Sequence, residues 1–323
     1  MSRGSDLSQI RHPVITIVGP TASGKSSLSL SVAEKLNGEI ISADSMQIYR
    51  YMNIGTAKVD LSKTAIKHYG IDIIDPGQSY SAQLFQEYAR QAIVQIDASN
   101  HVPILCGGTG FYVQAVLEDM RFPSGEQTDN PVREKYQTYL QTHGNKALWE
   151  LLNRKDPSSA EIIHPHNTRR VIRALEMSDE GIKYSDQVKS IKSLPSVVPS
   201  VRFGLKVDPT ILADRINHRV DLMIENGLID EVNDLLSKGF ENALTAPQAI
   251  GYKEIVAYLH NQTTLTEAID QIKTATRRYA KRQRSWFRRD KKLLWLDADS
   301  NTPNELAELI LQIYTSRFNV TTS

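Results

Sequence analysis

The residues with the most recognisable chemistry lie in the segment Gly19-Pro-Thr-Ala-Ser-Gly24-Lys25-Ser26. An apolar run at 14–18 precedes it and an amphipathic stretch at 25–36 follows, so the sequence predicts a strand, a glycine-bounded loop and a helix. Backbone N–H groups at the start of such a helix lack helical partners and, together with the helix dipole, favour an anion. Lys25 adds a positive charge, and Ser26 offers a hydroxyl to Mg²⁺. We therefore predict a site for a phosphate or diphosphate.

Two further polar clusters follow apolar runs in the first third of the chain. Asp44 and Ser45 come after the run at 39–42, and Gly107-Gly-Thr109-Gly comes after the run at 102–106. Because ligands of parallel α/β sheets bind at the carboxyl ends of strands, we expect both clusters to lie beside the phosphate loop. Asp44 could hold Mg²⁺, act as a general base or cap a helix, and the sequence leaves this open. Thr109 could donate its hydroxyl to a phosphate oxygen.

The elements that must position these residues alternate between apolar runs and amphipathic stretches, which is typical of an α/β fold. We predict a P-loop NTPase-like parallel sheet core flanked by helices, with a small all-helical insertion domain. The predicted core has a first part at 10–122 and a second part at 201–320, separated by the insertion at 123–200. The predicted strands are 14–18, 39–42, 71–74, 102–106, 201–207 and 293–296. The predicted helices are 25–36, 82–98, 110–117, 131–143, 145–153, 157–163, 167–179, 209–226, 228–238, 247–259, 264–289 and 302–317.

Two groups of residues imitate functional motifs but have simpler explanations. Asp72 and Asp75 resemble the acidic strand end of an NTPase, but a Pro-Gly pair follows at once, which favours a turn. His164 and His166 have no cysteine or acid pair beside them that would complete a metal site. We interpret these histidines as loop residues or RNA contacts.

The bulk composition sets limits on the class of protein. The net charge is +1 and there is one cysteine, Cys106, so an internal disulfide framework is excluded. Cys106 ends an apolar run, which favours a buried small hydrophobe over a nucleophile. No apolar segment is long enough to span a bilayer, and the first residues do not resemble a signal peptide. We expect a cytoplasmic protein without a membrane partner.

A strongly basic segment lies near the carboxyl terminus. Residues 273–292 hold ten Lys or Arg and a single acid, Asp290. In the helix predicted over 264–289, a basic face carries Arg277, Lys281, Arg284 and Arg288, and the inward face carries Ile269, Ile272, Thr276, Tyr279, Gln283 and Trp286. A solvated charged face usually mixes signs, so nucleic acid is the favoured partner. A second basic patch lies at 169–173.

Taken together, these motifs resemble the bacterial tRNA dimethylallyltransferases, also called tRNA isopentenyltransferases of the IPP transferase family. The matching segments follow the family order across nearly the whole chain. They are 19–26, 44–49, 54–58, 75–76, 80–82, 107–112, 169–176, 250–252, 279–283 and 286–288. The family commonly has His-Pro-Asn-Asp before its arginine pair, whereas this chain has His164-Pro-His-Asn167, which leaves a direct contact at this point in doubt.

The resemblance implies transfer of a dimethylallyl group from dimethylallyl diphosphate to N6 of adenosine 37 of tRNA, with no ATP consumed. Asp44 would accept the proton of the amine. Lys25, Thr109, Mg²⁺ and one of two arginines, Arg215 or Arg219, would stabilise the departing diphosphate. Ser26 would be the ligand of Mg²⁺. The diphosphate would lie against Gly19, Pro20, Thr21, Ala22, Ser23, Gly24, Lys25 and Ser26.

The resemblance also implies that the target base leaves the anticodon stack, and that the anticodon stem-loop contacts several separate segments. We expect the protein to act as a monomer. The implied tRNA contacts are Asp44, Ser45, Met46, Gln47, Thr109, Arg133, Arg169, Arg170, Val171, Ile172, Arg173, Gln248, Ala249, Ile250, Gly251, Tyr252, Lys253, Lys281, Arg282, Gln283, Arg284, Ser285, Trp286, Phe287 and Arg288.

Three alternatives share part of the pattern. A P-loop nucleotide or small-molecule kinase has the same loop but leaves the basic aromatic helix unexplained. An RNA-remodelling NTPase requires an acidic strand end that the sequence does not offer. A simple RNA-binding module has no use for Lys25 or Asp44.

Overall fold

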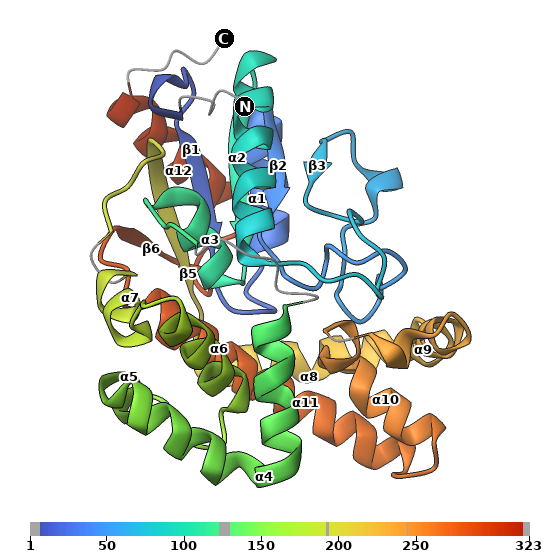
Figure 1. Ribbon diagram of the computed structural model, residues 1–323. Helices are drawn as coiled ribbons and strands as arrows, with labels where there is room; N and C mark the ends of the chain where they lie inside the picture. Colours follow the sequence, from blue (N-terminus) through green and yellow to red (C-terminus); the bar gives the residue numbers. More distant parts are fainter. Residues whose placement is uncertain (1–6, 123–129, 192–193, 244, 319–323) are drawn as a thin grey trace. The chain divides into compact units, whose positions relative to one another are not determined.

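The computed structural model describes residues 7–122, 130–191, 194–243 and 245–318 (Figure 1). The chain divides into two compact units, one made of Met1–Leu117 with Val197–Ser323 and the other of Glu118–Ser196. The predicted border between 122 and 123 falls at the start of the segment 123–129, which lies outside the described residues, as does the predicted end at 320.

A sheet of six parallel strands forms the centre of the first unit, in the order β3-β2-β4-β1-β5-β6. Its strand β1 lies between β4 and β5, with Val18 in register with Gly107 and Gly204. This topology confirms the predicted P-loop-like α/β class. The strands are β1 Val14–Val18, β2 Gly38–Ser42, β3 His68–Tyr69, β4 Val102–Gly107, β5 Ser200–Lys206 and β6 Leu293–Asp297.

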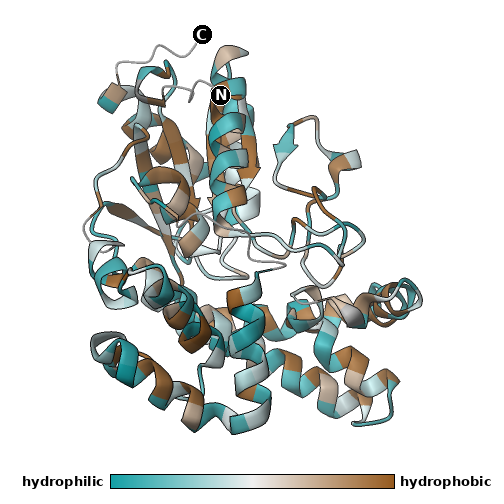
Figure 2. Ribbon diagram, viewed as in Figure 1, coloured by the Kyte–Doolittle hydropathy of each residue, from teal (hydrophilic) through white to brown (hydrophobic). Residues whose placement is uncertain are grey.

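Alternate side chains of β1 enter two separate hydrophobic cores, one on each face of the sheet. Val14 and Val18 pack with α2 (Ala82–Ala98) and α3 (Gly110–Leu117). Ile15 and Ile17 pack with α1 (Lys25–Leu36) and α12 (Pro303–Phe318). Figure 2 shows β1, β5 and β6 as largely hydrophobic and β3 as hydrophilic, while α2 turns many hydrophilic residues toward the viewer. Because both faces are covered, the central strands β1 and β4 are buried along their length.

The strand predicted at 71–74 is wrong. The sheet strand in this region is the short β3, and residue 74 forms only a single bridge with Tyr49. Asp72 adopts a left-handed backbone (φ 54°) that cannot continue a strand. Its carboxylate instead pairs with Lys58, with 2.6 Å between Oδ1 and Nζ. As predicted from the following Pro-Gly pair, the segment forms a turn.

Four helices complete the described second half of the first unit: α8 Pro209–Glu225, α9 Leu228–Ser237, α10 Tyr252–Leu259 and α11 Leu265–Phe287. Helix α11 begins with a capping box, in which Thr264 and Glu267 satisfy each other's backbone N–H groups. The helix predicted to begin at 247 begins at Tyr252 instead. A 3₁₀ turn, η4 (Ala246–Gln248), and the left-handed Gly251 (φ 97°) precede it.

The second unit is helical within its described residues, as predicted. It contains α4 Pro131–Lys155, α5 Pro157–Ile162, α6 Thr168–Asp179 and α7 Tyr184–Ile191, of which α7 was not predicted. Gly144 leaves the helical conformation (φ 78°) inside α4, at the point where two separate helices were predicted. Tyr136, Leu148, Val171 and Leu175 belong to the core of this unit.

Candidate active site

The phosphate loop leaves the carboxyl end of β1 and enters α1 through a tight backbone path. A side chain at Gly19 would place a Cβ 2.8 Å from Ser23 Oγ, and Gly24 adopts a left-handed conformation (φ 88°) at the helix start. The backbone conformation therefore favours glycine at Gly24, and a side chain at Gly19 would displace the Ser23 hydroxyl. Lys25 Nζ donates to the carbonyl of Pro20 at 3.3 Å, which holds the ammonium group over the loop.

The two other polar clusters lie beside this loop, as predicted. Thr109 N donates to Ala43 O at 3.0 Å, and Ser45 N donates to Thr109 Oγ1 at 3.0 Å. A Cβ on Gly107 would lie 2.2 Å from Ala43 O, so the loops that follow β2 and β4 touch only because this residue has no side chain. Since β4 lies between β2 and β1, all three clusters meet at the carboxyl edge of neighbouring strands.

Of the roles that the sequence left open for Asp44, the structure shows a local backbone hydrogen bond, and it places the carboxylate near the cations of the site. Its Oδ1 accepts a hydrogen bond from Met46 N at 3.0 Å, which is a local backbone cap. The same carboxylate also acts electrostatically on Lys25, Arg219 and Tyr279. Asp44 therefore shapes its own loop and faces the charged groups of the site.

The two cations at the site, Lys25 and Arg219, are half-buried. Burial lowers the pKa of the Lys25 ammonium, with Arg219 lowering it further and Asp44 opposing both. Burial also lowers the pKa of the Arg219 guanidinium, again against the effect of Asp44. Two desolvated cations thus share one carboxylate, and a bound anion would restore favourable interactions to both.

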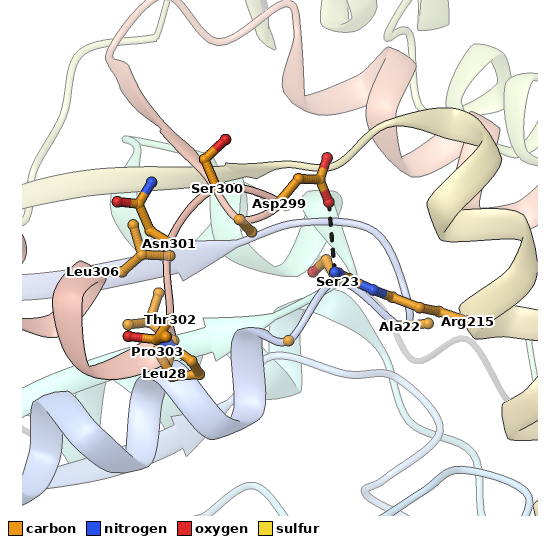
Figure 3. Close-up of a pocket in the computed structure, with 12 residues that line it drawn as sticks. Ala22, Ser23, Leu28, Arg215, Asp299, Ser300, Asn301, Thr302, Pro303 and Leu306 are labelled. Carbon is orange, nitrogen blue, oxygen red and sulfur yellow. Dashed lines mark ion pairs between the residues drawn. The ribbon is translucent and has the colours of Figure 1, made fainter.

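The arginines one turn apart on α8 occupy different surroundings. Arg219 lies within electrostatic reach of Lys25 and Asp44. Arg215 is instead paired with Asp299, with 3.5 Å between Nη2 and Oδ1, at the side of the loop (Figure 3). The alternatives that the sequence could not separate therefore differ in the structure, and Arg219 is the one beside Lys25 and Asp44.

A pocket of about 470 Å³ opens beside the phosphate loop. Figure 3 shows Arg215 and Asp299 meeting near Ser23, with the turn after β6 along the other side. The pocket is lined by Ala22, Ser23, Gly24, Leu28, Arg215, Ala298, Asp299, Ser300, Asn301, Thr302, Pro303 and Leu306. It mixes apolar and polar groups next to the loop.

Helix α11 contacts the site through residues spaced along one face. Tyr279 lies close to Thr109, and Gln283 hydrogen-bonds to Thr21 in the phosphate loop and to Gly108. Trp286 packs edge-on to Phe111, with 6.3 Å between ring centroids. Trp286 is still 36% exposed, whereas its neighbour Phe287, which was not assigned to the inward face, is only 2% exposed.

Sequence reasoning missed a carboxylate that organises the segment 53–58. Glu231 accepts hydrogen bonds from the backbone N–H groups of residues 53, 54 and 55 at 2.9, 2.8 and 3.2 Å, and from Tyr252 OH at 2.6 Å. Gln47 Nε2 donates to the carbonyls of residues 56 and 57 at 3.2 and 3.4 Å. The family segments 54–58 and 250–252 thus meet at Glu231, for which no pattern in the sequence gave a sign.

The implied tRNA contacts in the first unit differ in exposure. Asp44, Ser45, Met46, Gln47, Thr109, Ile250 and Arg284 are half-buried. Five of the implied contacts have buried side chains or backbone and do not face solvent: Ala249, Gly251, Tyr252, Gln283 and Phe287. The exposed ones are Gln248, Lys253, Lys281, Arg282, Ser285, Trp286 and Arg288.

In the second unit, Arg133 and Arg173 both pair with Glu176, which is 2% exposed, at 2.6 and 3.1 Å. Val171 and Ile172 belong to the hydrophobic core, so burial removes their side chains from any RNA surface. Arg169 and Arg170 are exposed. His164 and His166 stack on each other, with 5.3 Å between ring centroids.

The described residues offer few protein ligands for the predicted Mg²⁺. Within the described residues, no group of three or more His, Cys, Asp or Glu could hold a metal ion. Mg²⁺ in phosphate sites commonly uses one or two protein oxygens together with substrate phosphates and water. The exposed Ser26 at the start of α1 fits that kind of site, and Asp44 acts electrostatically on the adjacent Lys25. Cys106 is buried, as predicted.

The parallel sheet, with its glycine-bounded loop between the central strand and α1, places the protein in the P-loop-like α/β class. Within the described residues, no helix is both long and apolar enough to cross a bilayer. The sequence profile described as IPP transferase matches residues 47–290. The chain belongs to this family, which confirms the resemblance drawn from the motifs.

The names of individual relatives agree with this family assignment. A tRNA dimethylallyltransferase of Carboxydothermus hydrogenoformans is 45% identical over 306 residues, or 92% of this chain and 96% of that one. The crystal structure of a tRNA delta(2)-isopentenylpyrophosphate transferase from Staphylococcus epidermidis is 39% identical, with a TM-score of 0.70 over 94% of this chain and 99% of that one. A eukaryotic dimethylallyltransferase acting on tRNA is 31% identical, with a TM-score of 0.80 over 95% and 80% of the two chains.

Proposed function

We propose that this protein transfers a dimethylallyl group from dimethylallyl diphosphate to N6 of adenosine 37 in tRNA, giving N6-isopentenyladenosine and free diphosphate. The observation that carries the proposal is the position of Asp44 beside the phosphate-loop Lys25 and Arg219. A kinase of the same fold class has no evident need for a basic helix against its phosphate loop, and nothing in the structure or among the relatives favours that alternative.

The phosphate loop would hold the leaving group. As the bond between the allylic carbon and oxygen breaks, negative charge grows on the diphosphate. The loop amides, Lys25 and Arg219 are fixed in advance around that position, so they stabilise the charge without reorganising. When bound, Mg²⁺ would neutralise further charge, held by Ser26 and the diphosphate oxygens.

Asp44 would act on the other reactant. The exocyclic amine of adenosine is a weak nucleophile, because its lone pair is delocalised into the ring. As the new C–N bond forms, the nitrogen becomes acidic, and the Asp44 carboxylate accepts the proton. The hydrogen bond from Met46 N keeps this carboxylate in place.

The tRNA would bind through exposed basic side chains. Suited to phosphate contacts are Lys281 and Arg282 on α11, Arg288 at its C-cap, and Arg169 and Arg170 on α6. The target base lies within a stacked loop, so we propose that it is extruded into the site. We also propose that the protein is cytoplasmic and acts as a monomer. Light scattering during size-exclusion chromatography would test the monomeric state.

The decisive experiment mixes purified protein, MgCl₂, dimethylallyl diphosphate and unmodified tRNA carrying adenosine 37, without ATP. Nucleoside mass spectrometry should find an adenosine heavier by one five-carbon prenyl group. Unmodified tRNA, together with phosphoryl transfer from ATP in a parallel reaction, would contradict the proposal and favour the kinase. Omitting Mg²⁺ in a third reaction tests the metal requirement.

A further inference from the structure

We infer that Gln283 is a positioning residue of the diphosphate site and not a tRNA contact. This inference rests on the proposed function, because it assigns a task within the same active site. Gln283 lies in the basic stretch of α11 and is only 5% exposed. Its side-chain amide joins two loops that leave neighbouring strands of the sheet.

The two hydrogen bonds run in opposite directions. Thr21 N, in the phosphate loop, donates to Gln283 Oε1 at 2.8 Å. Gln283 Nε2 donates to Gly108 O, in the turn after β4, at 2.9 Å. A backbone N–H can only donate and a carbonyl can only accept, so these partners fix the orientation of the amide. Glutamate could satisfy only Thr21, and lysine could satisfy only Gly108.

The surrounding backbone is shaped to admit this side chain. A Cβ on Gly108 would lie 2.2 Å from Gln283 Nε2, so only glycine leaves room for the amide. A Cβ on Gly110 would likewise lie 2.1 Å from Trp286 Cδ1, one turn further along α11. The turn after β4 thus carries glycines where side chains of α11 approach it.

The amide determines which loop donors remain for an anion. Thr21 N–H is already bonded to Gln283, so a diphosphate would use the N–H groups nearer the start of α1. Gly108 immediately precedes Thr109, whose hydroxyl accepts from Ser45 N in the Asp44 loop. Gln283 therefore fixes the position of the phosphate loop relative to the loop that carries Asp44.

A tRNA contact requires a different orientation. The basic neighbours Lys281, Arg282 and Arg288 are exposed, whereas Gln283 faces inward. Because only 5% of Gln283 is exposed, an RNA base could reach its amide only if the side chain left this buried position. The side chain of Gln283, although it lies in the basic stretch of α11, is thus directed at the phosphate loop.

The test compares three variants in the full-length protein. Gln283→Met keeps the side-chain volume and removes both hydrogen bonds, whereas Gln283→Glu keeps the acceptor for Thr21 N. Gln271→Met makes the same chemical change at an exposed position of α11 and is the matched control. Calorimetry measures inorganic diphosphate binding in MgCl₂, and fluorescence anisotropy measures binding of an anticodon stem-loop RNA.

We expect Gln283→Met to weaken diphosphate binding about tenfold, with RNA affinity changed less than about twofold. Gln283→Glu should weaken diphosphate binding as well, because its carboxylate faces the Gly108 carbonyl and adds negative charge. The control should match the parent protein in both assays. Should Gln283→Met fail to fold, Gln283→Leu, which also removes both hydrogen bonds without adding charge, takes its place.

Weakened RNA binding with unchanged diphosphate binding would make Gln283 an RNA contact and overturn the inference. Equal losses for both ligands with a lower melting temperature would show a general structural role, and no change in either would show no role. The binding assays need no turnover, so they decide the inference even if the parent protein fails to prenylate tRNA and the proposed function is wrong.

Discussion

At the scale of single residues, stabilisation of the departing diphosphate depends on which of two arginines faces it. Arg215 and Arg219 lie one turn apart on α8, yet Arg215 is paired with Asp299 while Arg219 acts on Lys25 and Asp44. We expect Arg219→Gln to lower kcat/KM by about a hundredfold, because it removes a fixed cation from the diphosphate. Arg215→Gln should cost less than about threefold. Steady-state kinetics with varied donor checks the order, and the reverse order would contradict the assignment.

Asp44 allows an equally specific prediction. Asp44→Asn keeps an oxygen to accept the hydrogen bond from Met46 N, so the loop should stay in place. The amide cannot accept the proton of the adenosine amine, and we expect kcat to fall by about 10² to 10⁴. Asp60→Asn is the matched control, since Asp60 also accepts from a backbone N–H two residues on, at 3.1 Å, but lies outside the site.

Steady-state assays at saturating substrates measure kcat for both Asp44→Asn and Asp60→Asn, and filter binding measures their affinity for tRNA. The Asp60 variant should behave like the parent protein. A kcat for Asp44→Asn within a few-fold of the parent would remove the general-base role from this residue.

The residues that the sequence predicted well are those whose chemistry is local. Lys25, Asp44 and Thr109 each follow a buried strand, and the rule for parallel sheets brings them together. The choice between Arg215 and Arg219 could not be made, because it depends on Asp299, which is distant in sequence. Helical periodicity placed Gln283 on the inward face correctly, but its hydrogen-bond partners could not be predicted, since they lie on two other loops.

At the scale of elements, the loop at 53–58 is held from outside by α9 and α10. Glu231→Ala would leave three backbone N–H groups and Tyr252 OH without their acceptor. Glu231 is half-buried, so water can replace part of the loss, and we expect a decrease of about 2 kcal/mol in the free energy of unfolding. Glu231→Gln keeps one acceptor oxygen and should lose less. Urea denaturation measures both.

The effect of Glu231 should extend to catalysis, because the loop bonds to Gln47 in the Asp44 loop. Asp234→Ala, an exposed acid on the same helix, serves as the control and should leave stability and kcat unchanged. If Glu231→Ala is as stable as the parent protein, the hydrogen bonds to residues 53–55 contribute nothing beyond what water supplies.

Errors in the predicted elements also arise from contacts that the local sequence pattern does not show. The apolar run at 71–74 has the pattern of a strand, but the Lys58–Asp72 ion pair and the left-handed Asp72 fold it into a turn. Helix α10 starts late because Gly251 is left-handed, which depends on the packing of the preceding 3₁₀ turn. Long amphipathic helices such as α2 and α11 were predicted closely, since periodicity alone defines them.

At the scale of the whole molecule, the second unit is inserted through two adjacent chain segments. Val197 N donates to Leu117 O at 2.9 Å, and Asp119 N donates to Pro195 O at 2.9 Å. Glu118 and Ser196 form an antiparallel bridge. The insertion therefore enters and leaves the first unit as a paired hairpin, a geometry that a two-residue Asn-Gly turn can close.

Replacing residues 119–195 by Asn-Gly should leave the first unit folded. The phosphate loop, Asp44, Thr109 and Arg219 all belong to that unit, so diphosphate affinity in MgCl₂ should stay within about twofold of the parent. tRNA binding should weaken, because the exposed Arg169 and Arg170 are lost. The slope of log affinity against log salt should fall by about one for each lost phosphate contact.

The full-length double variant Arg169→Gln/Arg170→Gln is the control for this deletion, since it removes the charges and keeps the insertion. Calorimetry gives the diphosphate affinity, and RNA binding at several salt concentrations gives the slope. If the deletion variant binds tRNA with the affinity and salt slope of the parent, the insertion has no part in RNA recognition, and the basic residues of α11 carry it alone. Loss of diphosphate binding in a folded variant would instead show that the donor site needs the second unit.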